Sequence, residues 1–349
     1  MKCVIVTHRL RGGGAERVSQ LWIKALCELG LSVTVILLDE TASTTVSDET
    51  QISISALGSG FLTRAFRLRK ILQKINADFV FGFQTYPNLL VCLASLLGST
   101  SKIYLSEHTV PSIYLSNKSF ALRVQLSLAR LLYRRAQGVI AVSHSVATDL
   151  LIRFKISSDK CFVLPNSLST IGSKKANTVT VENLNIVVPA RFSADKRPHF
   201  ALEIGQALAD KVERLKIRWI GDEDGTAVMF PKESPEWFKR EAWDDDWMTT
   251  LEPGTIVMVT SAVEGFGNIF VDAAAGGFRA VASSTALGVG DSIIPGITGF
   301  LAITDSPEAF AMAIMKAARC GKEMGLETWS NRHGLTELKE NLSFMLGIK

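Results

Sequence analysis

Residues 256–283 read IVMVTSAVEGFGNIFVDAAAGGFRAVAS, and this stretch decides the predicted fold. A short β-branched run at 256–260 leads into a glycine-rich loop, and the apolar run at 268–275 ends at two glycines, as helices often do. A second short apolar run follows at 280–283. The order strand, loop, helix, strand predicts two parallel strands joined by a helix, with the glycine-rich loop at the carboxyl end of the first strand.

The same alternation of short apolar runs and helix-like stretches extends along the rest of the chain. Continuous Val, Ile and Leu runs separated by helices of roughly 9–16 residues indicate parallel sheets covered on both faces. The other expected strands are 2–7, 32–38, 79–83, 102–106, 138–142, 186–189 and 216–220. The other expected helices are 15–29, 62–75, 87–97, 120–135, 146–154 and 198–208. We therefore expect an α/β protein.

A polar stretch without apolar period, residues 169–182, divides the chain and is expected to be a linker. On either side we expect a doubly wound, Rossmann-like domain, at 1–168 and at 183–325. A C-terminal helical segment, 326–349, is expected to pack back on the first domain. In two tandem domains of this kind, the natural ligand position is the interdomain cleft at the carboxyl ends of the strands.

Length and composition agree with this organisation. The chain has 349 residues, of which 47% are apolar and 21% charged, and this excludes a disordered or fibrous protein. No apolar stretch reaches the roughly 18 residues that cross a bilayer, and the first strand is too short for the core of a signal peptide. The five cysteines occur singly, which argues against disulfides and zinc sites and indicates a cytoplasmic protein.

Charge is distributed unevenly. Residues 1–170 contain 19 Lys and Arg and 10 Asp and Glu, whereas the remainder contains 19 and 24. A basic first half suits an anionic partner, and drift in surface composition is the alternative. Cations also recur at helical spacing, at Arg67, Lys70 and Lys74 and at Arg123, Arg130 and Arg134. Such stripes fit peripheral contact with an anionic membrane as well as a solvated helix face, and no nucleic-acid module is recognisable.

Gly12, Gly13 and Gly14 follow the first expected strand and open the first expected helix. Glycine lets the backbone approach a ligand closely, and the free N–H groups of a helix N-terminus bind anions. A dinucleotide site is one alternative, because Asp39 ends the next strand where a ribose-binding acid would stand. Arg17, however, occupies the position of that motif's third glycine. A plain tight turn is the other alternative.

Charged residues gather where strands of the second domain end. Arg191 and Lys196 lie five residues apart in a strand-to-helix loop, where both can point at one diphosphate; a solvated loop is the alternative. Glu264 lies in the glycine-rich loop quoted above, and Asp272 lies about one turn inside the next helix. Two acids at unequal depths beside an anion site can accept hydrogen bonds from hydroxyls of two sugar rings. This motif is the most specific in the sequence.

The chain resembles the GT-B-fold retaining glycosyltransferases of family 4, also called the glycosyl transferases group 1 family. The residues that carry the resemblance are Gly12-Gly-Gly-Ala-Glu-Arg17, Ala141-Val-Ser-His144, Val163-Leu-Pro-Asn166-Ser, Arg191 with Lys196, Gly221-Asp222, and Glu264-Gly-Phe-Gly267 with Asp272. The resemblance implies a nucleotide-sugar donor held mainly by the second domain and an acceptor against the first. It also implies transfer with retention of configuration and without a metal.

The resemblance assigns roles to individual residues. Arg191 and Lys196 would bind the donor diphosphate, Glu264 the transferred sugar and Asp272 the ribose. His108, after the strand at 102–106, matches a family position near the reacting sugar. The implied catalytic residues are Glu264, Lys196, Arg191 and His108. The implied donor-binding residues are Gly12, Gly13, Gly14, Arg191, Lys196, Glu264, Gly265, Phe266, Gly267, Asn268, Ile269 and Asp272, of which the three N-terminal glycines would close over the phosphates.

Two features depart from the family. The second acid is normally a glutamate, and Asp272 is shorter by roughly 1.3–1.5 Å, so an indirect ribose contact is expected. Residues 222–253, which would normally help to hold the base, fit the family poorly. They include Asp244-Asp245-Asp246, which resembles the metal site of another glycosyltransferase fold. Because no strand is expected before this run, we interpret it as an acidic surface loop.

The sequence thus predicts a cytoplasmic, metal-independent retaining hexosyltransferase without a cofactor. Its substrates would be a UDP- or GDP-sugar and a cell-surface polysaccharide or lipid-linked glycan. Peripheral contact with the inner face of an anionic membrane is part of this prediction, and nucleic acid is excluded as a partner. A catalytically silent GT-B subunit that binds a partner enzyme or glycan is the main alternative, and a nicotinamide-dependent oxidoreductase is the other.

Overall fold

The computed structural model describes residues 1–10, 13–38, 51–52, 60–116, 119–167, 182–223, 225, 228, 230–231, 233–320 and 326–348. The chain divides into two compact units. Unit 1 consists of Met1–Ser169 and Gly334–Lys349, and unit 2 of Thr170–His333. Apart from residue 182, the expected linker lies outside the described residues, and so does Gly12.

Unit 1 contains a parallel sheet. Its described strands are β1 (Lys2–Thr7), β2 (Ser32–Leu37), β3 (Gln51–Ile52), β4 (Phe79–Phe83), β5 (Lys102–Glu107), β6 (Gly138–Ala141) and β7 (Cys161–Val163). They lie in the order β3-β2-β1-β4-β5-β6-β7. In β1 the register runs from Lys2 opposite Ser32 to Thr7 opposite Leu37. Every residue of β4 is buried, as expected for a central strand with both faces covered.

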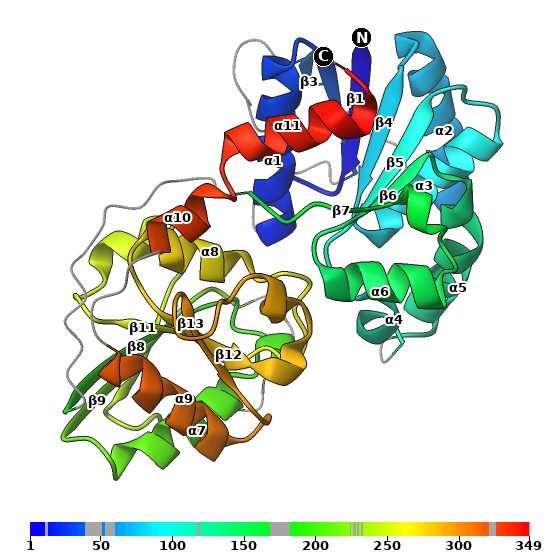
Figure 1. The fold of residues 1–349 in the computed structure, drawn as a ribbon. Coiled ribbons are helices and arrows are strands. Elements are labelled where there is room, and N and C mark those ends of the chain that lie inside the picture. The colour runs from blue at the N-terminus through cyan, green and yellow to red at the C-terminus, as the bar shows by residue number, and fades with distance from the viewer. Residues whose placement is uncertain are drawn as a thin grey trace. The chain divides into compact units, whose positions relative to one another are not determined.

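The helices of unit 1 form two groups (Figure 1). In one group α2 (Phe61–Ile75) packs on α3 (Thr85–Leu96), which packs on α5 (Phe120–Leu132); in the other α1 (Gly14–Glu28) packs on α11 (Leu335–Leu346). The remaining short elements are α4 (Pro111–Tyr114), η1 (Tyr133–Arg135), α6 (His144–Arg153) and η2 (Ser158–Lys160). In the core, Trp22 of α1 meets Phe81 and Phe83 of β4 edge-on, at centroid distances of 5.4 and 5.2 Å.

The C-terminal helix α11 completes unit 1 and packs across α1 (Figure 1). Its Leu338, Leu342 and Met345 are buried in the core that α1 shares. The chain returns to unit 1 at Gly334, whereas α10 (Leu326–Asn331) belongs to unit 2. The segment expected as one piece, 326–349, is therefore divided between the units, because the short helix α10 packs on α8 of unit 2 instead.

Unit 2 contains a second parallel sheet. Its described strands are β8 (Asn183–Pro189), β9 (Arg214–Ile220), β10 (Phe238–Glu241), β11 (Ile256–Val259), β12 (Ala280–Ser283) and β13 (Gly299–Ala302). They lie in the order β10-β9-β8-β11-β12-β13. The chain starts in the middle at β8, moves outward to β10 and then returns to the other side of β8 at β11. The order reverses between β8 and β11, which is the topological switch point where open α/β sheets bind ligands.

Helices also flank this second sheet. They are η3 (Ala194–Lys196), α7 (Pro198–Ala209), η4 (Trp247–Thr250), α8 (Asn268–Ala275), η5 (Ser284–Ala286), η6 (Gly288–Asp291), α9 (Pro307–Arg319) and α10. α7 and α9 pack on each other and share one apolar cluster, which includes Phe200 and Phe310. A second cluster joins Phe270 of α8 to Trp247 of η4. The expected α/β architecture of two Rossmann-like halves is confirmed.

Most predicted elements occur, and β1, β4, β12 and α8 have the predicted bounds. The sequence analysis missed β3, β7, β10, β13, α4 and α9. β7 is apolar but only three residues long, and three of the four residues of β10 are charged, so neither forms an apolar run of the usual length of a strand. α9 had usable signals, because the Ser306 side chain accepts a hydrogen bond from the Ala309 N–H and Pro307 stands at the first helical position.

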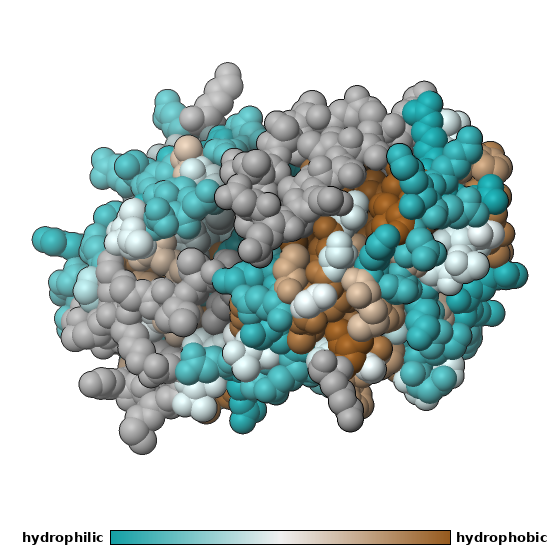
Figure 2. Space-filling model, turned by 90° about the horizontal axis from the view of Figure 1, so that it is seen from above, coloured by the Kyte–Doolittle hydropathy of each residue, from teal (hydrophilic) through white to brown (hydrophobic). Residues whose placement is uncertain are grey.

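Within the described part of the chain, no helix combines the length and the apolar character needed to cross a bilayer. Figure 2 shows a face covered mainly by hydrophilic side chains, with one hydrophobic area among them. All five cysteines are free thiols, which agrees with the expected lack of a disulfide framework.

Candidate functional site

Lys196 and Glu264 meet at the switch point of unit 2. Lys196 ends η3, in the loop after β8, and Glu264 lies in the loop after the neighbouring strand β11. The Lys196 Nζ donates to Glu264 Oε1 at 2.6 Å, and the two side chains are 24% and 15% exposed. Both residues were predicted to contact the same nucleotide-sugar donor, and in the structure their side chains contact each other directly.

Thr260 and Arg197, which were not predicted as site residues, hold the backbone around Lys196. The Thr260 hydroxyl, at the end of β11, donates to the Lys196 carbonyl. The next residue, Arg197, has a left-handed backbone (φ 53°), and its Nε donates to the Thr260 carbonyl at 2.6 Å. Its two terminal nitrogens bind both carboxylate oxygens of Asp305 at 2.6 and 2.8 Å. The loop after β8 is thus fastened to the end of β11.

Glu264 is fixed by backbone contacts with the loop after β12. Its N–H donates to the Ala286 carbonyl at 3.0 Å, and its carbonyl accepts from the Gly288 N–H at 3.2 Å. Residue 288 must be a glycine, because a β-carbon there would lie 2.1 Å from the Gly265 carbonyl oxygen. The close approach of these two loops fixes the backbone that carries the Glu264 carboxylate.

The N-terminus of α8 follows directly. Gly267 precedes the helix with φ 85°, and a β-carbon would lie 2.3 Å from the Phe270 ring, so only glycine fits this turn. No side chain of the described residues caps the helix at Gly267. Asn268 and Ile269, both half-buried, form the first turn. The partial positive charge of this turn favours an anion next to Glu264 and Lys196.

The other predicted donor-binding residues of unit 2 differ in accessibility. Arg191 is exposed directly after β8, where a ligand can reach it. Gly265 and Phe266 are buried, and the Phe266 carbonyl accepts from the Ser292 hydroxyl at 2.6 Å. Asp272 is only 2% exposed, so its short side chain reaches little solvent. A direct ribose contact by Asp272 therefore stays a prediction.

Two buried hydroxyls that have no hydrogen-bond partner among the described residues lie in the same two loops. Ser193 follows β8 and Ser261 follows β11, and each residue is 1% exposed. An unsatisfied buried polar group lowers stability and is uncommon in folded proteins. Each of the two loops at the switch point therefore contains one unsatisfied buried hydroxyl, a feature that most loops lack.

His108 belongs to unit 1 and directly follows β5. Its Nε2 is 3.0 Å from the Ser106 hydroxyl, and its ring stacks on Phe83 at 5.5 Å. Its Nδ1 is buried, and the part of the chain that the structure describes offers it no hydrogen-bond partner. Burial lowers the pKa of His108 to about 4, so the imidazole is neutral near pH 7. This neutral ring suits an orienting role better than acid–base chemistry.

The sequence analysis did not single out Glu107, the neighbour of His108. Glu107 is 1% exposed and accepts hydrogen bonds from Thr85 Oγ1 and Asn88 Nδ2, both at 3.1 Å, and from the Tyr133 hydroxyl. Burial raises the pKa of Glu107 to about 7 despite these three donors. The carboxyl group thereby ties the end of β5 to α3 and η1.

The predicted glycine loop is described from Gly13 onward. Gly13 precedes α1 in an extended conformation, and Gly14 is the first helical residue. A β-carbon on Gly13 would lie 2.6 Å from Glu16 Oε2, so this glycine makes room for the carboxylate of the first helical turn. Glu16 is also 3.7 Å from Arg9 Nε. The extended backbone of Gly13 is not that of a tight turn, and the predicted role of these glycines at the donor phosphates stays a prediction.

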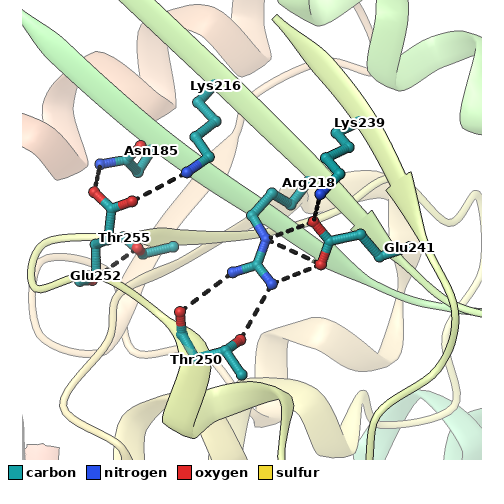
Figure 3. A network of polar contacts seen from close by, with 8 residues as sticks. All are labelled: Asn185, Lys216, Arg218, Lys239, Glu241, Thr250, Glu252 and Thr255. Carbon is teal, nitrogen blue, oxygen red and sulfur yellow. Dashed lines mark hydrogen bonds and ion pairs between the residues drawn. The ribbon is translucent and has the colours of Figure 1, made fainter.

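The segment after β10 is anchored by a polar network (Figure 3). Arg218 of β9 donates to both carboxylate oxygens of Glu241, the shortest contact being 2.7 Å, and to the carbonyl and hydroxyl of Thr250. Glu252 accepts from Lys216 Nζ at 3.1 Å. Hydrogen bonds from Arg218 are the main cause of the lowered pKa of Glu241. The segment 222–253, which fits the family poorly, is therefore anchored to β9 by ion pairs and hydrogen bonds.

The acidic run at Asp244–Asp246 follows β10, so the expectation that no strand precedes it is wrong. All three residues are exposed. The indole N–H of Trp243 donates to Asp245 Oδ1 at 2.8 Å, and the Asp246 N–H donates to Asp244 Oδ1 at 2.9 Å. Among the described residues, no group of His, Cys, Asp and Glu is arranged to hold a metal ion. The run is an acidic surface loop, as expected.

Known proteins resemble the chain over most of its length. A relative from Campylobacter jejuni, N-acetylgalactosamine-N,N'-diacetylbacillosaminyl-diphospho-undecaprenol 4-alpha-N-acetylgalactosaminyltransferase, is 26% identical over 292 residues, and the match covers 78% of this chain and 78% of the relative. The fold is similar to that of Anabaena HepE in complex with UDP and glucose, with a TM-score of 0.75, 18% identity and 99% of each chain covered. It is also similar to sucrose-phosphate synthase from Thermosynechococcus elongatus, with a TM-score of 0.78, 14% identity and 99% and 98% covered.

Two family models match the two halves of the sequence. The model for Glycosyltransferase Family 4 matches residues 12–170, and the model for Glycosyl transferases group 1 matches residues 183–319. Together they include the sheet of unit 2, every described strand of the unit 1 sheet except β1, and the loops that carry Lys196 and Glu264. The chain therefore belongs to the family 4, group 1 glycosyltransferases of GT-B fold.

Proposed function

We propose that this glycosyltransferase transfers a sugar from a UDP- or GDP-sugar to a lipid-linked glycan or cell-surface polysaccharide, with retention of configuration and without a metal. The observation that carries the proposal is the contact between Lys196 and Glu264 at the switch point, beside the N-terminus of α8. The name of the Campylobacter jejuni relative, with its diphospho-undecaprenol acceptor, supports the acceptor class. The UDP and glucose in the Anabaena structure support the donor class.

The donor diphosphate would be bound by positive charge from three sources. Lys196 would exchange its contact with Glu264 for a phosphate oxygen, and exposed Arg191 would bind a second oxygen. The first turn of α8 would add backbone N–H groups. As the sugar–phosphate bond breaks, negative charge grows on the departing diphosphate, and these fixed groups stabilise it without reorganisation. No metal is required in this scheme, because Lys196 and Arg191 supply the charge.

The transferred sugar would be bound by the carboxylate of Glu264, which accepts hydrogen bonds from its hydroxyls once Lys196 turns to the phosphate. The loop contacts with Ala286 and Gly288 keep this carboxylate in place. The neutral imidazole of His108 would orient the reacting sugar or acceptor. Retention follows when the acceptor attacks from the side on which the diphosphate leaves.

Contact with an anionic membrane is the proposed route to a lipid-linked acceptor for a cytoplasmic enzyme. On α2, Leu62 and Phe66 are 63% and 47% exposed, and the cations Lys70 and Lys74 lie on following turns. The basic residues of α5 and η1 are a weaker candidate. Arg134 Nε donates to the Phe154 carbonyl at 3.0 Å, and the Arg130 guanidinium lies over the ring of the same phenylalanine.

A thermal-shift panel tests the donor site. UDP, GDP, ADP and NAD are added to the intact chain in the presence of magnesium or of EDTA. We expect one of UDP and GDP to raise the melting temperature equally in both, since saturation at 100 times Kd adds about 2.7 kcal/mol. Lys196→Ala should abolish the shift, whereas Lys216→Ala, which removes an exposed lysine paired with Glu252, should preserve it.

Three other outcomes of the thermal-shift panel would contradict parts of the proposal. A shift that requires magnesium would contradict the metal-independent mechanism. A shift with NAD alone would contradict the nucleotide-sugar donor. If no nucleotide shifts the melting temperature, the result would favour a catalytically silent subunit that binds a partner enzyme or glycan.

A further inference from the structure

Leu287 combines two features that a leucine in a loop rarely has. Its backbone has φ 57° and ψ −90°, a left-handed conformation that a β-carbon disfavours. Its side chain is also 37% exposed. The other described non-glycine residues with positive φ are Asn76, Gln84, Lys155 and Arg197, so Leu287 is the apolar member of this group.

The strained backbone of Leu287 is bound to Glu264. The carbonyl before it, of Ala286, accepts from the Glu264 N–H, and the N–H after it, of Gly288, donates to the Glu264 carbonyl. Leu287 and Glu264 are therefore partners in an isolated parallel bridge. This pair of hydrogen bonds, at 3.0 and 3.2 Å, enforces the conformation. A strained residue that is fixed in this way is a marker of a functional site.

The fold does not require a leucine here. A glycine would adopt this backbone without strain and keep both hydrogen bonds, because these involve only the main chain of the neighbours. The isobutyl group is not among the buried residues of the apolar cluster that Ala286 and Val289 join. Its presence is therefore unfavourable for the backbone and leaves apolar surface in water. A ligand at Glu264 would give this side chain a function.

We propose that Leu287 is a specificity-determining residue that packs against an apolar substituent of the transferred sugar, the methyl group of an N-acetylated hexosamine. This inference rests on the proposed binding of that sugar by Glu264. The isobutyl group next to Glu264 cannot hydrogen-bond, so a sugar hydroxyl placed against it would lose water without replacement. An acetamido methyl at the same place removes apolar surface from water on both partners.

Matched donors test this proposal by binding alone, so the acceptor need not be known. The dissociation constants of the intact chain are measured by titration calorimetry for UDP-N-acetylgalactosamine against UDP-galactose, and for UDP-N-acetylglucosamine against UDP-glucose. UDP serves as the reference. We expect at least one pair to favour the N-acetylated sugar by roughly 10-fold, the lower end of what one methyl-sized group gives in a pocket.

Two variants separate the side chain from the strain. Leu287→Ala keeps the β-carbon and removes the isopropyl end of the side chain, and Leu287→Gly also relieves the strain. Both should reduce the preference to about twofold or less and leave the affinity for UDP unchanged. Leu287→Gly should also raise the melting temperature. Lys155→Gly is the matched control, because Lys155 has the same φ of 57° in unit 1 and should change stability without changing the preference.

The outcomes distinguish this inference from the proposed function. If the wild type binds UDP and the paired sugars but shows no N-acetyl preference, or keeps it in Leu287→Ala, the role of Leu287 is refuted and the donor site stands. If the wild type binds none of the five compounds, the UDP-sugar donor and this inference both fail.

Discussion

Glu107 and Glu264 lie at the carboxyl ends of central strands, one in each unit, but their surroundings differ. Glu107 is 1% exposed and is surrounded by the hydroxyls of Thr85 and Tyr133 and the amide of Asn88. The side chain of Glu264 is 15% exposed and pairs with the cation of Lys196 from the adjacent loop. The first carboxyl group has only neutral partners, whereas the second has one charged partner.

This difference separates an anchor from a binding group. Three neutral donors of unit 1 surround the buried carboxyl group of Glu107, and a ligand could replace them only by disrupting the core. Lys196 and Glu264 are partly accessible and carry opposite charges, so an anion and a hydroxyl can each take one of them. Position at a strand end is therefore not enough to identify a functional acid. The residues that contact the carboxyl group distinguish a binding group from a structural one.

The largest effect should appear in activity when the charge of Glu264 is removed. We expect Glu264→Gln to lower the transfer rate by about 100- to 1,000-fold, as for loss of one preorganised polar contact in a transition state. The free energy of unfolding should change by about 1 kcal/mol or less, because Lys196 can still reach water. Rate measurements and urea denaturation of the same preparation check both. A rate near that of the wild type would refute the assignment of Glu264.

The converse pattern is expected for Glu107. Glu107→Ala should lower the free energy of unfolding by about 3 kcal/mol, since it leaves three buried donors unsatisfied and creates a cavity. Urea denaturation measures this change. Donor affinity should remain within about twofold at temperatures where the variant is folded, since Lys196, Arg191 and Glu264, which bind the donor diphosphate and sugar in our proposal, are in unit 2. A stable variant without donor binding would reverse the comparison and place Glu107 in the site.

A smaller loss should follow from breaking the network in Figure 3. Arg218→Met removes the hydrogen bonds to Glu241 and Thr250 and should lower the free energy of unfolding by about 1–2 kcal/mol. Lys216→Met is the control, because Lys216 and Glu252 are 52% and 59% exposed and such pairs contribute about 0–1 kcal/mol. Equal losses in the two variants would show that the network does not depend on the buried guanidinium.

The sequence predicted the fold well because parallel strands buried on both faces are continuous apolar runs. Charged or very short strands such as β10 and β7 lack that signal and were missed. Lys196 and Glu264 were identified from local motifs and family resemblance. Thr260, Arg197 and Asp305 were not, because their contacts join residues more than 60 positions apart. Leu287 could not be predicted from the sequence, because its backbone conformation depends on main-chain hydrogen bonds between its neighbours and Glu264 in another loop.

The smallest effect concerns the pH dependence of stability, where Glu107 and His108 oppose each other. The pKa of Glu107 rises on folding from 4.5 to about 7, so its contribution is greatest below pH 4.5 and is lost as the pH rises to 7. The pKa of His108 falls from 6.5 to about 4, so its contribution is greatest above pH 6.5 and is lost as the pH falls towards 4. Between about pH 4.5 and 6.5 the two slopes largely cancel in the wild type.

Single variants should reveal each slope. In Glu107→Gln the free energy of unfolding should increase with pH between 4.5 and 6.5, because the lowered pKa of His108 is then no longer offset by the raised pKa of Glu107. In His108→Phe, which keeps an aromatic ring against Phe83, it should decrease with pH over the same interval. Urea denaturation at half-unit steps of pH measures both, and acids with lowered pKa, such as Asp305, contribute only below this window. Parallel pH profiles in the two variants would show that the neutral donors around Glu107 keep it ionised despite burial, which would remove the physical basis for treating it differently from Glu264.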